Sequence, residues 1–498
     1  MSEKLIPSRS EVEALLAGGK YRRVPIAKEI FADAFTPVET VRILRNASKH
    51  CFLFESAEQE ERWGRYSFLG FQPQMAISCT DGHIILSKET DDGEKVVQEG
   101  PVAHPGSIIR KILSEYTSPI IKELPPFTGG LVGYFSYDYI KYAEPNLDLT
   151  SQEGTDFKDV DLMLFNDIIA FDTYKQKIYI ISGVLNGDID GAVERIDEIE
   201  KLLRSGAKKY FPPLSIDTEI KPFKNKVQFC AMVDAAKDYI REGDIFQVVL
   251  SNPMTAEASG SLFDTYRVLR ATNPSPYMIY MSSEDIEVAA SSPETLARLD
   301  IADGRKVFTF PLAGTRARGK TPEEDAEIEK GLLADEKELA EHNMLVDLGR
   351  NDIGRISAIG TVKVEKYMEI ERFSRVMHIG STVTGRLRDD YDAVNCVDSI
   401  LPAGTLSGAP KFRACQIIQE LEGRKRGLYG GAIGYIDFSG NLDVCIAIRL
   451  VYKKKGQIVI QSGAGIVADS VPENEWNECR NKAAAVVDAC RAAEGGIE

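Results

Sequence analysis

The chain has 498 residues, which is long enough for two or more domains, each with a sizeable core. Its 60 Lys and Arg residues against 76 Asp and Glu residues give a formal net charge of −16, which argues against nucleic acid or an anionic membrane as the main partner. The first residues lack an apolar leader and no run reaches the roughly 18 apolar residues of a membrane span, so we expect a cytoplasmic protein.

Strand-like segments dominate the first half of the chain. A helix is predicted over residues 10–17 and another over 191–204, and the apolar runs between them have the length of strands. This order is typical of an α+β fold with antiparallel sheets rather than of alternating βαβ units. The Pro- and Lys-rich segment 210–226 is typical of a linker. We therefore expect two lobes of antiparallel sheet flanked by helices, over residues 1–220 and 221–498.

The second lobe begins with a predicted amphipathic helix over residues 226–241, which ends at Gly243. Strands and helices follow, separated by glycine-rich turns that are far denser than in the first half. This density places the expected chemistry in the C-terminal lobe.

Residues 335–355 form a predicted helix with carboxylates in an unusual place. At helical spacing Glu338 and Glu341 share a stripe with two leucines. A carboxylate buried among leucines costs several kcal/mol unless a cation or hydrogen bonds compensate for it. For this stretch alone, the solvated rim of a surface helix is the simpler interpretation.

A second predicted helix, over residues 472–490, makes a cation site a better interpretation than a solvated helix rim. Glu475, Glu478 and Lys482 lie along one of its sides, and like charges three residues apart repel unless a cation lies between them. Two acidic helix faces can share one cation. Carboxylate oxygens with open water positions favour Mg²⁺, for which His342 is a poor ligand because imidazole suits softer metals.

Basic and glycine-rich segments provide candidate anion sites in the same half. The loop over residues 310–320 gathers three cations, although exposed basic loops are usually inert. Residues 401–423 form a glycine-rich loop that enters a helix. In residues 461–470 closely spaced glycines follow a strand, so backbone N–H groups can approach a carboxylate. Arg449, expected on a buried strand, would clamp a carboxylate with two hydrogen bonds.

His378 is expected on the polar face of a strand, opposite Met377 and Ile379. It can accept or hold a proton near neutral pH, and the chain has only five histidines. A surface histidine without a chemical role is the simpler interpretation of this position by itself.

Seven segments together closely resemble the chorismate-utilising enzymes. They cover the C-terminal half in family order: SSPETL, PLAGTR, AEHNMLVDLGRNDIGR, MHIGSTVTG, PAGTLSGAPK, YGGAIGY and QSGAGIVADSVPENEWNECRNKA. The segments FLFES, ERWGRYSFLG and NPSPYM narrow the resemblance to the large subunits of anthranilate synthase. This resemblance implies a Mg²⁺-dependent site that converts chorismate and ammonia into anthranilate and pyruvate, the first step of tryptophan biosynthesis.

The resemblance also implies roles for individual residues. Glu341 and Glu478 match the metal ligands, with Glu338 and Glu475 as support around them. Glu294 matches the general acid that protonates the departing C4 hydroxyl, and His378 matches the histidine that assists loss of the enolpyruvyl group as pyruvate. Thr405 lines the same pocket. The remaining substrate-binding positions are Gln247, Ala313, Gly314, Thr315, Tyr429, Arg449, Gly463, Ala464 and Gly465.

Two positions discriminate within the family. Enzymes that make isochorismate or salicylate carry a lysine base where this chain has Gln247, and aminodeoxychorismate synthases carry a nucleophilic lysine where it has Ala313. Without either lysine, the expected nucleophile is ammonia, attacking C2 of chorismate. Aminodeoxychorismate synthase and isochorismate or salicylate synthase remain the alternative activities. A catalytically dead regulator is a further alternative, which the presence of all four glutamates disfavours.

The eight cysteines bear on the source of ammonia. They are scattered without a Cys-x-x-Cys pair, which fits a reducing compartment, and we expect no disulfide. None lies in the Gly-x-Cys-x-Gly setting of a glutamine amidotransferase nucleophile, so the chain is not expected to hydrolyse glutamine. The resemblance implies a separate glutaminase small subunit, docked on this chain in a heterotetramer.

The resemblance finally implies an inhibitor site for tryptophan between the two lobes. Its expected residues are Glu55 and Ser56 from the N-terminal lobe and Pro276, Tyr277 and Met278 from the C-terminal lobe. The chain departs slightly from the family pattern, with FLFES where LLES is usual. A strand end and a proline turn are the simpler interpretation of the two segments.

Overall fold

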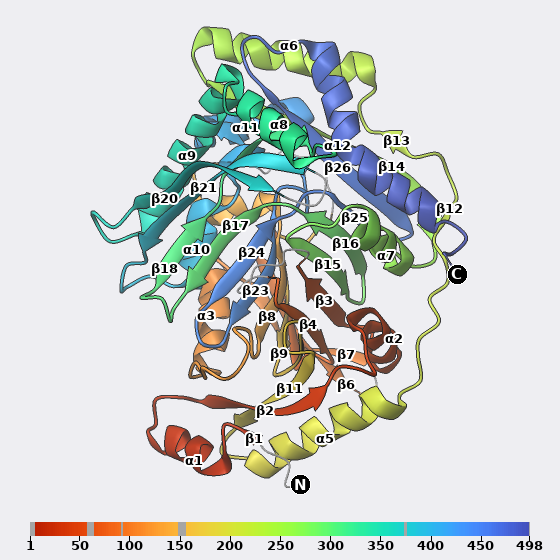
Figure 1. Ribbon diagram of the computed structural model, residues 1–498, viewed down its shortest axis with the longest axis vertical. Helices are drawn as coiled ribbons and strands as arrows, with labels where there is room; N and C mark the ends of the chain where they lie inside the picture. Colours follow the sequence, from red (N-terminus) through yellow and green to blue (C-terminus); the bar gives the residue numbers. More distant parts are fainter. Residues whose placement is uncertain (1–4, 57–63, 91–92, 148–155, 373–375, 498) are drawn as a thin grey trace.

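Strands from both halves of the chain pair into two large antiparallel sheets (Figure 1). The structure, a computed structural model, describes residues 5–56, 64–90, 93–147, 156–372 and 376–497. Residues 61–63, which begin the segment ERWGRYSFLG, lie outside these ranges. The α+β class with antiparallel sheets is confirmed.

The first sheet contains 14 strands among the described residues. Its order is β1 (Leu5–Ile6), β2 (Arg23–Phe31), β11 (Lys177–Leu185), β10 (Asp167–Asp172), β4 (Tyr66–Phe71), β3 (Cys51–Glu55), β15 (Tyr277–Ser282), β16 (Ile286–Ser292), β25 (Leu450–Lys454), β26 (Gln457–Ile466), β14 (Gln247–Ser259) and β12 (Ser215–Ile216), with β13 (Lys221–Pro222) and β22 (Gly408–Ala409) also paired to β14.

The second sheet contains 12 strands in the same part of the chain. Its order is β19 (Leu312–Ala317), β21 (Val376–Arg386), β18 (Lys306–Thr309), β17 (Thr295–Asp300), β24 (Leu442–Ile446), β23 (Ala432–Asp437), β8 (Gly130–Phe135), β9 (Val160–Phe165), β5 (Met75–Thr80), β6 (His83–Thr90) and β7 (Gly93–Pro101), with β20 (Lys363–Arg372) paired to β21.

Each sheet crosses the expected lobe boundary at residue 220. In the first sheet β3 pairs with β15, and in the second β8 pairs with β23. The division into residues 1–220 and 221–498 stays a prediction, and in the structure both ranges contribute strands to both sheets. Segments distant in sequence therefore lie side by side at these two seams.

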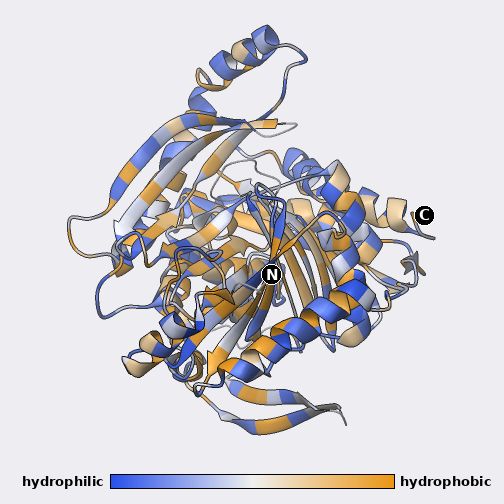
Figure 2. Ribbon diagram, turned by 60° about the horizontal axis from the view of Figure 1, so that its bottom comes forward, coloured by the Kyte–Doolittle hydropathy of each residue, from blue (hydrophilic) through white to orange (hydrophobic). Residues whose placement is uncertain are grey.

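The sheets pack face to face through a cluster of buried residues that come from both, among them Phe52, Phe165, Ile279 and Ile433. Helices cover the two outer faces (Figure 1). Figure 2 shows the apolar strands in the middle and hydrophilic sides on the surrounding helices. No helix in the described ranges is both long and apolar enough to cross a membrane.

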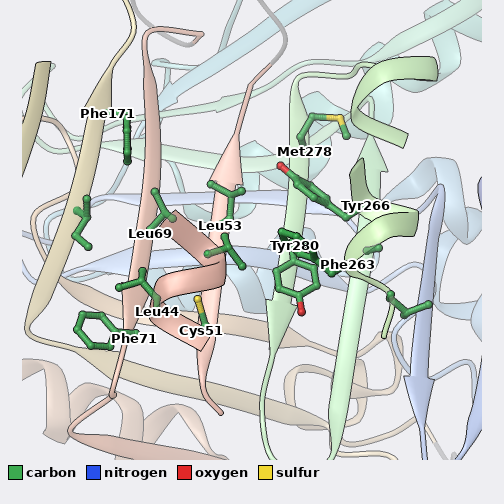
Figure 3. Close-up of a cluster of buried hydrophobic side chains, with 14 of the residues drawn as sticks. Leu44, Cys51, Leu53, Leu69, Phe71, Phe171, Phe263, Tyr266, Met278 and Tyr280 are labelled. Atoms are coloured by element: carbon green, nitrogen blue, oxygen red, sulfur yellow. The ribbon is translucent and has the colours of Figure 1, made fainter. Parts of the chain in front are cut away.

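Helices on the first sheet bury their apolar sides against its strands, as the close-up of that core in Figure 3 shows for part of it. These are α1 (Arg9–Ala17), α2 (Pro37–Ala47), α5 (Ile189–Ser205), α7 (Phe263–Thr272) and α12 (Pro472–Ala493), with α6 (Lys226–Glu242) and α11 (Lys411–Glu422) around β14 and β26. The remaining helices are α3 (Gly106–Ser114), α4 (Ile140–Ala143), α8 (Pro322–Leu332), α9 (Glu336–Ile356), α10 (Ala393–Ile400) and the short 3-10 turns η1 (Tyr137–Tyr139) and η2 (Gly404–Leu406).

Helix α6 shows how local sequence sets helix ends. Asn225 accepts from the backbone N–H of Gln228, whose side chain accepts in return from the N–H of Asn225. At the other end Gly243 adopts φ of 86°, a left-handed conformation that suits glycine. The helix predicted over residues 226–241 is thereby confirmed, as are those over residues 10–17 and 191–204 within two residues at each end.

Candidate active site

Helices α9 and α12 bring negative charges together. Loss of water around its carboxylate, followed by the charge of Glu338, raises the pKa of Glu341, and the charge of Glu478 on α12 acts in the same direction. Burial and the charge of Glu478 likewise raise the pKa of Glu475. Glu341 on α9 therefore lies close enough to Glu478 on α12 for their like charges to repel, and a cation between the helices would relieve this repulsion.

The buried stripe of α9 differs from the expected one. His342, Leu345 and Val346 are buried, whereas Glu341 keeps an exposed side. The stripe is rotated by one residue, so Glu341 lies at its edge rather than among leucines. His342 contacts Ser381 Oγ through Nε2 at 2.6 Å, and burial lowers its pKa to about 4, which keeps it neutral.

Two cations neutralise part of this acidic group. Lys482 Nζ lies 2.6 Å from Glu478 Oε1, and Arg316 lies 3.1 Å from Glu338 and 3.0 Å from Asp335. In the described part of the chain, no group of three or more His, Cys, Asp or Glu side chains is arranged as a ready metal site. A metal ion bound here would have to displace these lysine and arginine contacts.

Glu294 lies between β16 and β17 and has the properties of a general acid. Burial raises its pKa to about 8, although a hydrogen bond from Thr405 and the positive charge of Lys482 oppose the shift. Thr405 Oγ1, in η2, donates to Glu294 Oε1 at 3.4 Å. At neutral pH Glu294 is therefore mostly protonated and can give up a proton.

His378 lies on β21 next to a bulge in β19. Ala313 pairs with Ile379 and Thr315 pairs with His378, so Gly314 is left over and adopts φ of 59°. The bulge brings Thr315 Oγ1 and the Gly314 carbonyl each to 3.1 Å from His378 Nδ1. Burial lowers the pKa of His378, which therefore stays neutral at neutral pH and can accept a proton. His378 is partly buried, unlike a surface histidine.

Gly314 also lies against the acidic group, since a Cβ at this position would lie 3.2 Å from Glu338 Oε2. The bulge therefore joins the histidine and the carboxylates into one site. An L side chain at this φ would be strained, which explains the glycine.

Two expectations for the segments predicted to bind a carboxylate differ from the structure. Arg449 precedes β25 with φ of 52° instead of lying in a strand, and its Nη1 donates to the Lys482 carbonyl of α12. Gly463 and Gly465 lie inside β26, which continues to Ile466, so they form part of a strand rather than a loop. Glycines leave this stretch of strand without side chains on the site.

Tyr429 closes the same end. A Cβ at Gly463 would lie 3.0 Å from the Tyr429 hydroxyl, and Tyr429 is 4% exposed. The charge of Glu478 acts on the Arg449 guanidinium, which also lies near Tyr429. Ala464, by strand alternation, turns its side chain into the core around α6 and α11, so only its backbone can reach the site.

Gln247 is the first residue of β14 and is 6% exposed. A Cβ at Gly465 would lie 3.0 Å from Gln247 Nε2, which places the amide at the glycine strand. Its Oε1 is buried without a hydrogen-bond partner among the described residues. Such an oxygen is ready to accept a hydrogen bond from a ligand.

The chain matches the family described as chorismate binding enzyme over residues 49–488. It belongs to the chorismate-binding enzymes. It is 44% identical to anthranilate synthase component 1 from Acetivibrio thermocellus, in an alignment that covers 98% of this chain and 99% of that protein. It is 42% identical to the protein of the same name from Aquifex aeolicus (strain VF5), with 96% of this chain and 97% of that protein covered. The crystal structure of anthranilate synthase component I from Streptococcus pneumoniae TIGR4 superposes with a TM-score of 0.73 at 38% identity, covering 86% of this chain and 94% of that one.

This chorismate-binding enzyme also has a cavity of about 770 Å³ that includes most of the expected inhibitor residues. Ser56, Pro276 and Tyr277 line it. Tyr277 donates to Asp443 at 2.8 Å and its hydroxyl lies 2.8 Å from Thr295 Oγ1. Since Thr295 directly follows Glu294, the cavity and the candidate active site share the start of β17.

Met278 lies outside this cavity, whereas Glu55 lines it with the other expected residues. Met278 and Glu55 are direct partners across β3 and β15, so their side chains leave the same face of the sheet. Glu55 borders the cavity, but its carboxylate binds Arg270 at 2.7 and 3.1 Å and Tyr266 on α7. Met278 is 1% exposed and belongs to the helix-covered core, where Figure 3 shows it near Tyr266.

Lys482 is the site residue that sequence reasoning missed. In this chorismate-binding enzyme its charge acts on Glu294, Glu341 and Glu475, and it pairs with Glu478. The signal in the sequence was its spacing of four residues from Glu478 on one helix. This signal is weak, because most such pairs are ordinary surface ion pairs.

Proposed function

We propose that this chain is the chorismate-converting component of an anthranilate synthase, which forms anthranilate and pyruvate from chorismate and ammonia. The observation that carries the proposal is Glu294: a carboxyl group whose burial raises its pKa to about 8, beside an acidic group on two helices. Relatives 41–44% identical over nearly the full chain, named anthranilate synthase component 1, support this choice within the family.

The positive end of the site suits the side-chain carboxylate of chorismate. Arg449 can donate two hydrogen bonds to it, and the Tyr429 hydroxyl can donate a third. Glycines at positions 463 and 465 allow the carboxylate to approach the backbone of β26, because no Cβ fills the space. Fixed donors of this kind orient the substrate before the reaction.

Glu294 and His378 supply the two proton transfers. When ammonia attacks C2, the C4–O bond breaks, and the proton of Glu294 goes to the departing oxygen so that water leaves. The ammonium group formed at C2 loses one proton, which offsets the proton given by Glu294. The C2 proton is then removed as the C3–O bond breaks, and the enolpyruvate released takes up a proton to become pyruvate. His378 is neutral, and if Nδ1 donates its proton to Gly314, Nε2 keeps a lone pair that can take up a proton.

Glu341 and Glu478, supported by Glu338 and Glu475, would hold the Mg²⁺ ion that the resemblance implies. The residues fit such an ion: all donors are carboxylate oxygens, and burial together with the charge of neighbouring glutamates raises the pKa of Glu341 and of Glu475. When bound, Mg²⁺ would act as a Lewis acid on the ring carboxylate of chorismate.

The nucleophile distinguishes this activity from the alternatives in the family. Gln247 and Ala313 occupy the positions where related activities use a lysine, and a carboxamide or a methyl group cannot act as base or attacking amine. Isochorismate or salicylate synthase and aminodeoxychorismate synthase are therefore disfavoured. A glutaminase subunit as the source of ammonia, and a cytoplasmic location, remain part of this proposal.

Ammonia without glutamine should support turnover by the isolated chain. Purified chain with chorismate, Mg²⁺ and ammonium salt is expected to produce fluorescent anthranilate, and the rate should rise with pH as NH₃ replaces NH₄⁺. With glutamine as the only nitrogen source, no anthranilate is expected, because the chain lacks a glutaminase nucleophile. Accumulation of isochorismate or aminodeoxychorismate, or turnover of glutamine by the chain alone, would contradict the proposal.

Tryptophan is proposed to inhibit this activity by binding in the 770 Å³ cavity between Ser56 and Tyr277. A ligand there would contact Tyr277, whose hydroxyl reaches Thr295 beside Glu294. A ligand inhibits only if it binds the less active arrangement more tightly, and a cavity that borders two segments of the chain allows such a difference.

Ser56→Arg is expected to relieve tryptophan inhibition while changing uninhibited turnover little, because a longer side chain fills the cavity. The measurement is anthranilate formation against tryptophan concentration. Ser205→Arg makes the same change at an exposed position on α5 and should remain inhibited. Equal sensitivity of Ser56→Arg and the wild type would remove the cavity from the proposal, and a wild type indifferent to millimolar tryptophan would remove the regulation.

A further inference from the structure

An ion pair lies buried beside the site, at the C-terminal end of α11. The side chains of Arg426 and Glu422 are 1% and 3% exposed. Arg426 donates to both oxygens of Glu422, from Nε at 2.9 Å and from Nη2 at 2.5 Å. Burial of two charges is costly, and a well-packed apolar pair would often serve stability as well or better.

The other contacts of Arg426 lead to the candidate site. Nη1 donates to the carbonyl of Leu406 at 2.6 Å, and Leu406 directly follows Thr405, the hydrogen-bond partner of Glu294. Nη2 donates to the carbonyl of Val249 at 2.7 Å. One guanidinium group thus joins η2 to β14, because its planar fork offers donors in fixed directions.

Glu422 holds β14 at a second point. Its Oε1 accepts from Ser251 N at 2.7 Å and from Ser251 Oγ at 2.9 Å. In the β14–β26 ladder Ser251 pairs with Gly463, and Val249, the strand residue bound by Arg426, pairs with Gly465. The ion pair therefore holds β14 at the two positions that face the glycines of the site.

Tyr429 completes this arrangement. The Arg426 guanidinium lies 5.8 Å from the centre of its ring and 4.5 Å from that of Tyr137. Residues 426–429 are consecutive, so a shift of Arg426 would move Tyr429 with it.

We propose that Glu422 and Arg426 are positioning residues for catalysis, which hold the Thr405 segment, the glycine strand and Tyr429 at fixed separations. The inference rests on the proposed function, since it assigns these elements to the reacting substrate. The pair itself touches no substrate. Its role is to keep the acid, Glu294, aligned with a substrate whose carboxylate is fixed on the other side.

Arg23 provides a matched control. It is 0% exposed and donates to Asn166 Oδ1 at 2.7 Å, Ser118 Oγ at 3.2 Å and the Thr128 carbonyl at 2.7 Å. Like Arg426 it joins several segments inside the protein, but none of its partners belongs to the candidate site. Arg23→Lys should therefore lower stability without a specific effect on turnover.

The test compares Arg426→Lys, the double variant Glu422→Leu/Arg426→Met and Arg23→Lys with the wild type, using ammonia-dependent anthranilate formation per folded protein. Lysine at position 426 keeps the positive charge but cannot reach the carbonyls of both Leu406 and Val249. The double variant removes both charges, so it folds without an unpaired buried charge. For both we expect kcat to fall by roughly a hundredfold, because a misplacement of about 1 Å can cost that much. The chorismate KM should rise by much less than kcat falls, since Arg449, one of the carboxylate donors, is held separately by α12.

Amide hydrogen exchange gives a second, activity-independent measurement. In both pair variants exchange in residues 403–409 should rise by roughly tenfold relative to the wild type, while Arg23→Lys leaves that segment unchanged. A double variant that folds and keeps wild-type kcat and exchange would overturn the proposal. So would an equal loss of kcat in Arg23→Lys. An inactive wild type would instead count against the proposed function, and the exchange experiment would still decide the role of the pair.

Discussion

Glu341→Gln and Glu478→Gln are each expected to lower ammonia-dependent turnover by roughly a thousandfold, because Lewis-acid polarisation is worth several kcal/mol and each 1.4 kcal/mol is about tenfold in rate. Each change removes one negative charge from the group that would hold Mg²⁺. The apparent affinity for Mg²⁺, measured by titrating activity or by calorimetry, should fall in both variants.

The fold should survive both changes. Glutamine at position 341 removes a carboxylate whose pKa is raised by loss of water and by Glu338, so it relieves repulsion. Glutamine at position 478 loses the ion pair with Lys482. The side chains of Glu478 and Lys482 are 47% and 39% exposed, and ion pairs this exposed contribute less than about 1 kcal/mol. Glu336→Gln, at an exposed position on α9, is the matched control and should keep full activity. Near-normal turnover and Mg²⁺ affinity in either site variant would show that the two helices do not share a cation.

Glu294→Gln is expected to lower kcat by roughly 10²–10⁴-fold, the usual contribution of a general acid. Glutamine has nearly the same shape and can still accept from Thr405, but it has no proton to give to the C4 oxygen. In the wild type, the rate divided by the NH₃ concentration should be nearly level between neutral pH and about pH 8 and fall above it, because Glu294 loses its proton with a pKa of about 8. The Glu294→Gln variant should not show this fall in rate above about pH 8.

Stability offers an independent measurement of the same group. The pKa of Glu294 is about 8 in the folded chain against a usual value of 4.5, so between these values the folded state holds a proton that the unfolded chain releases. The carboxyl group therefore costs increasing stability as the pH rises through this window. Glu294→Gln should raise the free energy of unfolding relative to the wild type more at pH 8 than at pH 5.

Glu287→Gln is the control for loss of a buried carboxylate elsewhere. Glu287, 8% exposed on β16, accepts from Ser261 at 2.5 Å and Tyr280 at 2.7 Å, away from the site. It should change stability but not the pH dependence of kcat. If Glu294→Gln kept the wild-type kcat, or if its pH profile retained the fall above pH 8, another group would have to be the acid.

Local sequence determined the helices and the class of fold. Helix α6 begins at Asn225 and ends at Gly243 because the capping residues and the left-handed glycine act within a few positions of the chain. The same holds for the hairpin of β23 and β24, whose turn the glycine at position 440 permits with φ of 97°. Motifs such as AEHNMLVDLGRNDIGR also determined the family, because they are specific as strings of residues.

The tertiary structure alone decided what surrounds each side chain. Thr405 meets Glu294 across 111 positions and Glu422 meets Ser251 across 171, and no local pattern encodes either contact. Likewise, the pairing of β3 with β15 places Met278 in the helix-covered core, outside the cavity that Glu55, Ser56 and Tyr277 line. Periodicity can show that a residue lies on one face of an element, but burial, ionisation and hydrogen-bond partners depend on which distant element packs against that face. The candidate site residues could therefore be named from the sequence, whereas the protonated state of Glu294 and the burial of the Glu422–Arg426 ion pair depended on the folded chain.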